Sequence, residues 1–195
     1  LLRSVEPQLE KGFSNVIVLQ IEGLTASIFE REENGQKIMP YLNSIASLGI
    51  SFPNTIQSFN ATAGSVFSTV TGFHKICFDE KNKRFTTAEL NAYYGSLAHI
   101  LGEQNYNNYY FGGFRQSALD FLRFMGNQGY ETYGYEKLTK RLSKKGNLEH
   151  ADSALGIFDN EFLQEAANIL IESKKNYTAH LMTSTSHSPW VIPED

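Results

Sequence analysis

Short apolar runs alternate with stretches of helical spacing along this chain. Five of the six residues from Val16 to Ile21 are apolar, interrupted only by Gln20, which is typical of a strand buried on both faces of a parallel sheet. Similar runs predict four more strands, at Ser51 to Ser58, Tyr106 to Phe111, Glu131 to Tyr135 and Thr178 to Met182.

Helical periodicity fills the gaps between these strands. It predicts five helices, at Tyr41 to Leu48, Ala63 to Val70, Ser96 to Glu103, Ala118 to Asn127 and Asn160 to Ser173. The last helix carries an apolar stripe that we interpret as core packing, at Phe162, Ala166, Ile169 and Leu170. Strands that alternate with helices predict an α/β fold, in which a mostly parallel sheet is flanked by helices on both faces.

One long stretch fits neither pattern. Residues 137–153 are the least regular part of the sequence, and we expect a mobile excursion there. The basic cluster within it, Lys137 to Lys145, is interpreted as a solvated helix or loop, with contact to an anionic membrane surface as the alternative.

Composition narrows the possible partners. The 195 residues carry a formal net charge of -4, and 41% of them are apolar, which is enough to build the core of one domain. The mild negative charge, without a basic patch interleaved with aromatics, predicts no nucleic-acid partner. The single cysteine, Cys77, excludes an internal disulfide, and no apolar stretch is long enough to span a bilayer.

Glu22 follows the first predicted strand directly. In open α/β sheets, ligands bind at the carboxyl edge of the strands, and a carboxylate there is a suitable ligand for a divalent cation. The alternative interpretation is that Glu22 is a solvated strand terminus.

The segment Asn60 to Phe67 is a turn of small residues that leads into a helix. The N-terminus of a helix favours a phosphate or a developing oxyanion. Thr62 would present its hydroxyl there, and a metal ion held by Glu22 would lower the pKa of that hydroxyl and make it nucleophilic. The alternative is that Asn60 or Thr62 caps the helix, and the two roles are compatible.

In order and spacing, these segments resemble the alkaline-phosphatase/sulfatase superfamily, and within it the membrane-anchored phosphoglycerol transferases of the lipoteichoic acid synthase and periplasmic-glucan types. Asn15 to Glu22 is similar to the first strand of the family with its metal-binding Glu, and Met39 to Phe52 to the helix and strand that follow. Later segments resemble the family as well, at Ser96 to Leu101, Tyr106 to Gly113, Phe158 to Leu163 and His180 to Trp190.

The resemblance implies a reaction and a set of site residues. Thr62 takes the place of the family's nucleophile and, with Glu22, ligates a divalent cation (Mn, Mg or Zn). His187 lies in the segment that resembles the family's strand with a substrate-contacting His, and the alternative is a histidine that stabilises a turn. From their places near the same edge of the sheet, Arg115 and Trp190 are also expected to bind substrate. The implied enzyme is a transferase that moves a phosphoglycerol or similar phospho-alcohol group from an anionic phospholipid donor to a glycan or polymer acceptor, through a covalent intermediate on Thr62.

The chain also departs from the family in three places. After the aromatic-Gly-Gly element, where the synthases place acidic and basic substrate-binding residues, this chain has Phe114 to Asp120, and Arg115 and Asp120 are the candidates to replace them. Thr62 lacks the nearby Pro and Arg that accompany the formylglycine nucleophile of hydrolytic sulfatases, so sulfatase chemistry is not expected. The family completes its metal site with an Asp-His pair downstream of the segment that contains His187, whereas this sequence ends at Asp195. We therefore interpret residues 1–195 as the N-terminal part of a single sulfatase-like catalytic domain, inactive by itself.

By resemblance, membrane helices that precede residue 1 anchor the native protein. The domain is then expected on the extracytoplasmic face of the bacterial cytoplasmic membrane, in the cell envelope. Two other functions stay open: a non-catalytic binding or scaffold module with the same fold, and a hydrolase, such as a phosphodiesterase, that passes the group to water.

Overall fold

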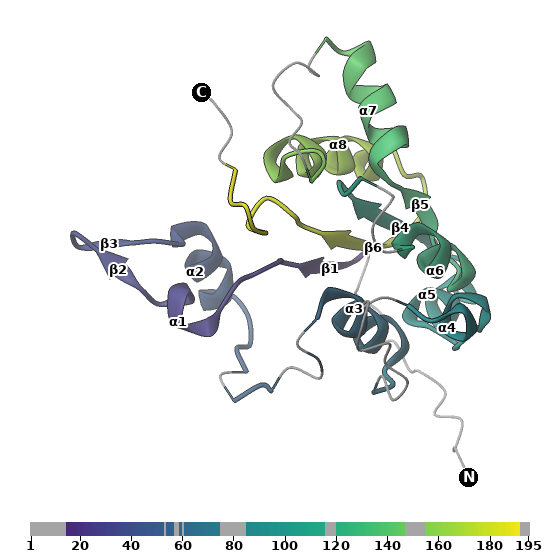
Figure 1. Ribbon diagram of the computed structural model, residues 1–195, viewed down its shortest axis with the longest axis horizontal. Coiled ribbons are helices and arrows are strands. Elements are labelled where there is room, and N and C mark those ends of the chain that lie inside the picture. Colours follow the sequence, from purple (N-terminus) through teal and green to yellow (C-terminus); the bar gives the residue numbers. More distant parts are fainter. Residues whose placement is uncertain are drawn as a thin grey trace.

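A four-stranded parallel sheet forms the centre of the computed structural model, which describes residues 15–52, 54–56, 59, 61–74, 85–115, 120–146 and 155–191. The strand order is β1, β6, β4, β5 (Figure 1). The strands are β1 (Val16–Gln20), β6 (Tyr177–Met182), β4 (Asn107–Gly112) and β5 (Glu131–Tyr133). Since all neighbouring pairs are parallel, the carboxyl ends of the four strands share one edge of the sheet.

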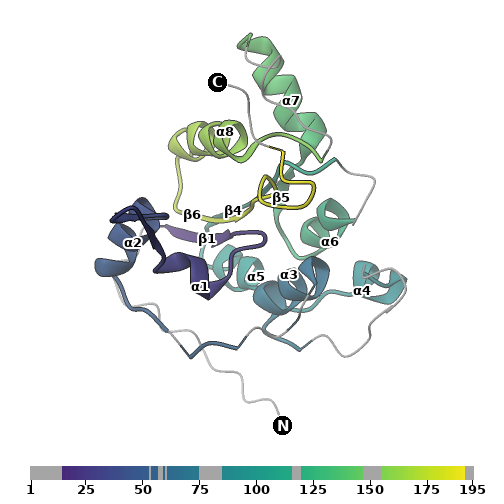
Figure 2. The same ribbon diagram turned by 60° about the vertical axis from the view of Figure 1, so that its left-hand side comes forward.

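Helices cover both faces of this sheet, which confirms the predicted fold class (Figures 1 and 2). One layer contains α3 (Thr62–Thr71), α4 (Thr87–Asn91), α5 (Leu97–Gly102) and α6 (Phe121–Asn127). The other layer contains α7 (Tyr135–Lys144) and α8 (Asp159–Ile171). A smaller group beyond the carboxyl end of β1 contains α1 (Ala26–Phe29), α2 (Pro40–Ser47), β2 (Glu32–Glu33) and β3 (Gln36–Lys37).

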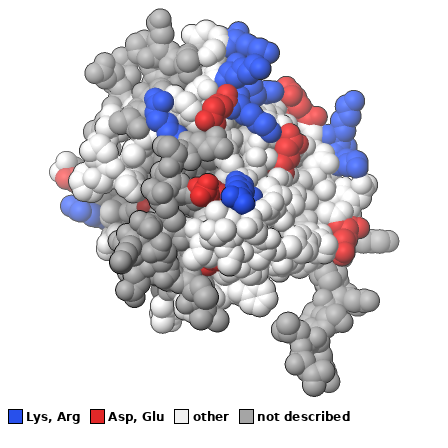
Figure 3. All heavy atoms as spheres, turned by 45° about the vertical axis from the view of Figure 1, so that its right-hand side comes forward, with Lys and Arg blue, Asp and Glu red and all other residues white. Residues whose placement is uncertain are grey.

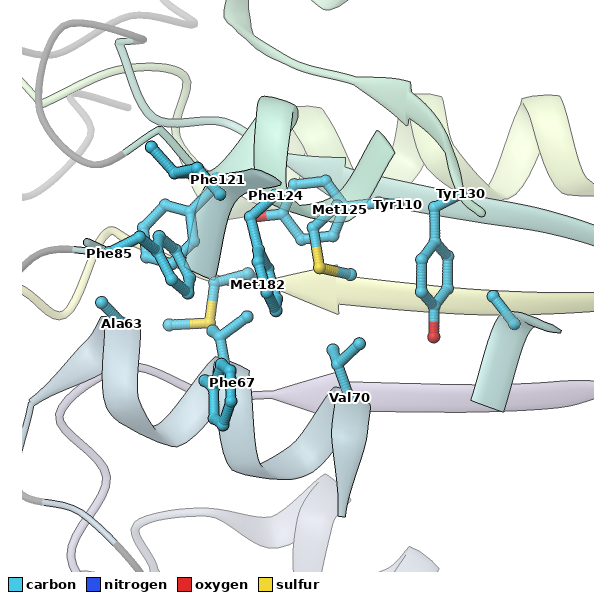
Figure 4. Close-up of a cluster of buried hydrophobic side chains, with 13 residues drawn as sticks. Ala63, Phe67, Val70, Phe85, Tyr110, Phe121, Phe124, Met125, Tyr130 and Met182 are labelled. Atoms are coloured by element: carbon cyan, nitrogen blue, oxygen red, sulfur yellow. The ribbon is translucent and has the colours of Figure 1, made fainter. Parts of the chain in front are cut away.

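The layer that contains α3 packs on the sheet through an aromatic core (Figure 4). The core residues of α3 recur at helical spacing and are at most 4% exposed: Ala63, Val66, Phe67 and Val70. The ring centroid of Phe67 lies 5.8 Å from that of Phe124 in α6. Burial of this apolar face holds α3 against the sheet, and it thereby fixes the position of Thr62 at the start of the helix.

On the opposite face, α8 contributes the stripe that the sequence predicts. Its buried members include Phe162, Ala166, Ile169 and Leu170. They belong to a cluster with Phe111 of β4 and Leu181 of β6, so the interpretation of this stripe as core packing is confirmed. The N-terminus of α8 is consequently held close to the carboxyl edge of the sheet.

β1 lies at the edge of the sheet, so the prediction that it is buried on both faces is wrong for the described residues. Ile17 and Leu19 are 57% and 45% exposed. They align with Ala179 and Leu181 of β6, which lie in the α8 core, and therefore point to the same face of the sheet. The described part of the chain leaves this face of β1 uncovered.

The strand predicted at residues 51–58 is not found among the residues described there, which are 51, 52 and 54–56. Instead, the backbone N–H and hydroxyl of Thr55 donate to the carbonyl of Phe52, at 3.2 and 2.7 Å, and close a turn. Phe52 and Ile56 are 75% and 91% exposed. An apolar run forms a strand only where a neighbouring strand accepts its hydrogen bonds, and the described residues supply none here.

The stretch predicted to be irregular, residues 137–153, begins as a regular helix, and residues 147–153 lie outside the described part. Leu138 and Leu142 of α7 are buried one helical turn apart and pack with the α8 core. The basic cluster is therefore helical as far as Lys144. Lys and Arg side chains gather at the top of the molecule, at the height of α7 (Figure 3). This high charge is what obscured the two-leucine stripe in the sequence.

Four short elements were not predicted: α1, α4, β2 and β3. For α4 a local signal exists, because Thr86 and Glu89 form a capping box. The backbone N–H of Glu89 donates to the Thr86 hydroxyl at 3.2 Å, and the Glu89 carboxylate accepts from the Thr86 N–H at 2.7 Å.

Candidate active site

Glu22 lies just beyond β1, at the carboxyl edge of the sheet, and its backbone is held on both sides. Its N–H donates to the hydroxyl of Thr183 at 2.9 Å, and its carbonyl accepts from the hydroxyl of Ser186. Gly23 follows with a φ of +65°, and a Cβ at this position would lie 3.2 Å from the carbonyl oxygen of Ser186. Glycine at position 23 thus allows the chain to turn sharply while Ser186 approaches closely.

Thr62 is the first residue of α3, and its hydroxyl donates to Oε2 of Glu22 at 3.0 Å. The structure thus brings together two site residues that lie 40 positions apart in the sequence. The capping position belongs to Ala61, which makes no side-chain cap, so the alternative that Thr62 is the N-cap is wrong. Asn60 lies outside the described residues. Because the Thr62 hydroxyl donates its hydrogen to Glu22, the oxygen keeps its lone pairs.

A turn that follows β6 also borders the site. The N–H of Thr183 donates to the carbonyl of Gln20 at 3.1 Å and so continues the β1–β6 pairing to the edge of the sheet. The N–H of His187 donates to the carbonyl of Ser184 at 3.0 Å and closes the turn. This turn, residues 183–187, therefore lies beside Glu22.

Asp159, the first residue of α8, holds the same turn. Its carboxylate accepts from the N–H groups of Ser184 and Thr185, at 2.7 and 3.0 Å. Its own N–H donates to the hydroxyl of Thr185 at 2.8 Å. The sequence analysis did not single out Asp159, because the two segments that it joins lie 25 and 26 positions apart. Its local signal is that of an acidic residue at the start of a predicted helix, which favours capping, whereas in the structure the N-cap is Phe158 and Asp159 is the first residue of α8.

His187 and Trp190 extend outward from this turn. Both are exposed, and Trp190 retains 71% of its accessible surface. Nδ1 of His187 lies 2.7 Å from the carbonyl oxygen of Ser188, and the N–H of Trp190 donates to the carbonyl of His187 at 3.0 Å. The two side chains are thus placed at the same edge of the sheet as Glu22, on the side open to solvent.

Arg115 follows β4 at the same edge but makes its visible contacts elsewhere. Its N–H donates to the carbonyl of Leu155 at 2.9 Å, and its guanidinium lies 4.5 Å from the centre of the Tyr135 ring. Tyr135 begins α7, so this cation–π contact directs Arg115 toward the α7–α8 layer. The structure brings Glu22 and Thr62 into contact and places Arg115 at their edge of the sheet.

His180 is a core residue. It is 1% exposed, its Nε2 lies 3.2 Å from Oε1 of Gln20, and its ring packs edge-on against those of Tyr110 and Tyr130. Burial lowers the pKa of His180 to about 4, so the imidazole is neutral at physiological pH.

The donor atoms of the site suit a hard divalent cation. A carboxylate and a hydroxyl are oxygen ligands, and Glu22 and Thr62 place two of them within 3.0 Å of each other. A divalent cation takes at least four ligands, and the described residues contain no group of three or more His, Cys, Asp or Glu side chains that could hold one. Glu22 and Thr62 therefore fit one part of a metal site.

Among the described helices, none has the length and apolar character needed to cross a membrane.

Several known proteins are similar to this chain in sequence or in fold. A model of the sulfatase family matches residues 14–195. The lipoteichoic acid synthase of Staphylococcus saprophyticus is 26% identical over 195 residues, which cover 93% of this chain and 28% of that protein. The structure of the lipoteichoic acid synthase LtaP from Listeria monocytogenes superposes with a TM-score of 0.75 and 20% identity, over 92% of this chain and 42% of that one. A protein in the alkaline phosphatase superfamily from Vibrio parahaemolyticus gives a TM-score of 0.70 and 19% identity, over 93% and 43%.

The likeness to these two solved structures shows that the chain is an α/β domain with the same fold. The match to the family model spans nearly the whole sequence, and the chain therefore belongs to the sulfatase family. It spans less than a third of the length of the curated relative and less than half of the two solved chains.

Proposed function

We propose that the polypeptide to which this chain belongs is a transferase. It moves a phosphoglycerol or similar phospho-alcohol group from an anionic phospholipid to a glycan or polymer hydroxyl. The observation that carries the proposal is the hydrogen bond between Thr62 and Glu22, at the start of α3 and at the carboxyl edge of the sheet. The similarity to lipoteichoic acid synthases supports the same class of reaction.

Thr62 is the proposed nucleophile. Its oxygen would form a bond to the phosphorus of the phospholipid while the bond from phosphorus to the diacylglycerol oxygen breaks, and the diacylglycerol oxygen takes up a proton. In the second half of the reaction, an acceptor hydroxyl would attack the same phosphorus, and the Thr62 oxygen would leave and regain a proton. The Glu22 carboxylate orients the Thr62 hydroxyl by accepting its hydrogen.

The start of α3 would stabilise charge on the phosphoryl oxygens. The N-cap residue Ala61 makes no side-chain bond to the first-turn N–H groups, and the helix dipole favours an anion there. A divalent cation (Mn, Mg or Zn), with Glu22 and Thr62 among its ligands, would when bound lower the pKa of the hydroxyl and offset phosphoryl charge.

Three side chains are proposed to bind substrate. His187 would donate to a phosphoryl oxygen, and the guanidinium of Arg115 would pair with an anionic group. Trp190, with most of its surface exposed, would pack against a glycerol or sugar.

The chain is proposed to be the N-terminal part of one catalytic domain in the cell envelope, on the extracytoplasmic face of the cytoplasmic membrane. Membrane helices elsewhere in the natural polypeptide would anchor it. The uncovered apolar face of β1 supports a larger domain, since exposed apolar sheet edges are normally paired or covered. The lengths of the relatives agree with this proposal.

One observation favours a second candidate function, a non-catalytic binding module. The residues that the structure describes contain no complete set of metal ligands. A module of this kind would bind the phospholipid headgroup or the polymer at the sheet edge without forming a covalent bond to Thr62.

Intact-mass and peptide-mapping spectrometry of the full natural polypeptide separates these functions. After incubation with anionic phospholipid and Mn²⁺, Mg²⁺ or Zn²⁺ in turn, a phosphoglycerol adduct is expected on Thr62. Thr62→Ala should abolish both adduct and transfer, and Glu22→Gln should lower adduct formation at least a hundredfold. Thr69→Ala, which changes an exposed threonine of the same helix, is the matched control and should behave as the unaltered protein. Full transfer by Thr62→Ala would rule out Thr62 as the nucleophile, and bound metal without an adduct would favour the binding module.

A further inference from the structure

We propose that Asp159 is a positioning residue of the active site. Its carboxylate holds the turn at residues 183–187, and residues of this turn hold the backbone of Glu22. The inference rests on the proposed function, because it concerns the orientation of Glu22 toward Thr62.

The contacts between Asp159 and the turn are reciprocal. Oδ1 accepts from the N–H of Ser184 at 2.7 Å and Oδ2 from the N–H of Thr185 at 3.0 Å, while the hydroxyl of Thr185 accepts from the N–H of Asp159 at 2.8 Å. Ser184 is only 2% exposed, so water does not readily replace its bond. Hydrogen bonds to an ionised carboxylate are stronger than those between neutral groups.

The position of Asp159 explains why a carboxylate is needed there. Two N–H groups point at two different oxygen atoms of one side chain, and only a carboxylate offers an acceptor at both places. Asp159 also lies in the first turn of α8, where the helix dipole favours a negative charge. An amide would turn its NH₂ group toward one of the two N–H donors.

The turn transmits this restraint to Glu22. Thr183 directly precedes the two residues that Asp159 holds, and its hydroxyl accepts from the N–H of Glu22 at 2.9 Å. Ser186 directly follows them, and its hydroxyl donates to the carbonyl of Glu22. The Glu22 carboxylate then accepts from Thr62 at 3.0 Å. Asp159 therefore acts on the nucleophile through two backbone contacts of Glu22.

The variant Asp159→Asn tests this role in the full natural polypeptide. We expect kcat for phosphoglycerol transfer to fall tenfold or more, with KM changed less than threefold, because displacement of a reacting group by about 1 Å can cost a hundredfold in rate. Glu161→Gln is the matched control. It removes a negative charge from the same turn of α8, where its visible side-chain contact is with Asn160, and it should leave both parameters unchanged.

Hydrogen exchange followed by mass spectrometry provides a readout that does not depend on activity. In Asp159→Asn, peptides that cover residues 16–24 and 183–188 should exchange at least tenfold faster, with no change in the α3 peptides. Should Asp159→Asn fail to fold, Thr185→Val removes one bond of the same set and should give a smaller change in the same direction. Exchange and kcat equal to those of Glu161→Gln would overturn the inference. Absence of any Thr62 adduct in the unaltered protein would instead count against the proposed function, while the exchange result still decides whether Asp159 holds the turn.

Discussion

His180 shows at the scale of one residue how position determines chemistry. Its imidazole packs in the core against Tyr110 and Tyr130, and its Nε2 lies 3.2 Å from the side-chain oxygen of Gln20. Burial lowers its pKa to about 4, whereas in the unfolded chain the pKa returns to about 6.5. Between these values the unfolded state binds the proton more readily than the folded state does. The stabilisation that the neutral, buried His180 provides is therefore complete above pH 6.5, and it is lost as the pH falls toward and through the pKa of the folded state.

We expect His180 to make the protein lose about 2 kcal/mol of its unfolding free energy between pH 7 and pH 5. His180→Gln keeps a polar side chain that does not titrate. Between pH 7 and pH 5, the unfolding free energy of this variant should therefore fall by about 2 kcal/mol less than that of the unaltered protein. Urea denaturation at half-unit steps of pH checks the prediction. Parallel pH profiles of the two proteins would contradict it.

At the scale of elements, α7 and α8 are joined by a buried carboxylate. Glu165 of α8 is 1% exposed and forms ion pairs with Arg141 and Lys145, at the end of α7. Burial alone would raise the pKa of the Glu165 carboxyl, but hydrogen bonds from Lys145, Arg141 and Asn168 hold it below its ordinary value. This pairing holds the C-terminal end of α7, while Leu138 and Leu142 hold its buried face.

The double variant Arg141→Met/Lys145→Met should lower the unfolding free energy by about 2 to 3 kcal/mol. The loss comes from a carboxylate that stays buried without its partners. The expected loss of unfolding free energy is at the lower end of the range for broken buried ion pairs, because both cations are more than a third exposed. Lys140→Met/Lys144→Met removes the same charge from exposed positions of α7 and should change stability by less than about 0.5 kcal/mol. Equal losses in the two variants by urea denaturation would show that net charge, not the Glu165 pairing, is responsible.

At the scale of the whole molecule, the main feature is the uncovered side of β1. Ile17 and Leu19 are about half exposed, and α2 adds Tyr41 and Ile45, at 84% and 65%. Neighbouring apolar side chains that stay exposed on one face of an edge strand mark a place where other protein packs. If the chain is part of a larger domain, as proposed, this face becomes interior.

If the chain is part of a larger domain, one pair of substitutions should lower the unfolding free energy less in the 195-residue chain than in the full natural polypeptide. Ile17→Thr/Leu19→Thr should cost less than about 1 kcal/mol in the 195-residue chain, because little burial is lost. In the full natural polypeptide, the same pair should cost about 3 kcal/mol or more. Ile171→Thr, at a position 82% exposed, is the control for a surface isoleucine. Small and equal costs in both contexts, measured by urea denaturation, would contradict the larger domain.

The main elements and the two central site residues were within reach of the sequence alone. Periodicity depends on neighbours a few positions apart, so it identified the fold class and the α8 stripe. The apolar run before Glu22 and the small-residue turn before α3 placed the two candidate side chains, Glu22 and Thr62, at the ends of their elements. The pattern left the basic cluster at Lys137 to Lys145 open between helix and loop, because its charge outweighed the two-residue stripe of Leu138 and Leu142. It also predicted a strand at residues 51–58 that lacks a partner among the described residues.

What only the tertiary structure decided are the contacts between distant segments. Sequence placed Glu22 and Thr62 at the ends of separate elements, and packing of α3 on the sheet brought their side chains to 3.0 Å. The reciprocal bonds of Asp159 with Ser184 and Thr185 left no local pattern, because they join residues 25 and 26 positions apart. Likewise, the apolar composition of β1 is the same for a central strand and an edge strand, and only its neighbours distinguish them. The spacing of apolar residues along the chain determines which helices and strands form. Contacts between side chains that are distant in the sequence depend on how core packing places those helices and strands in space.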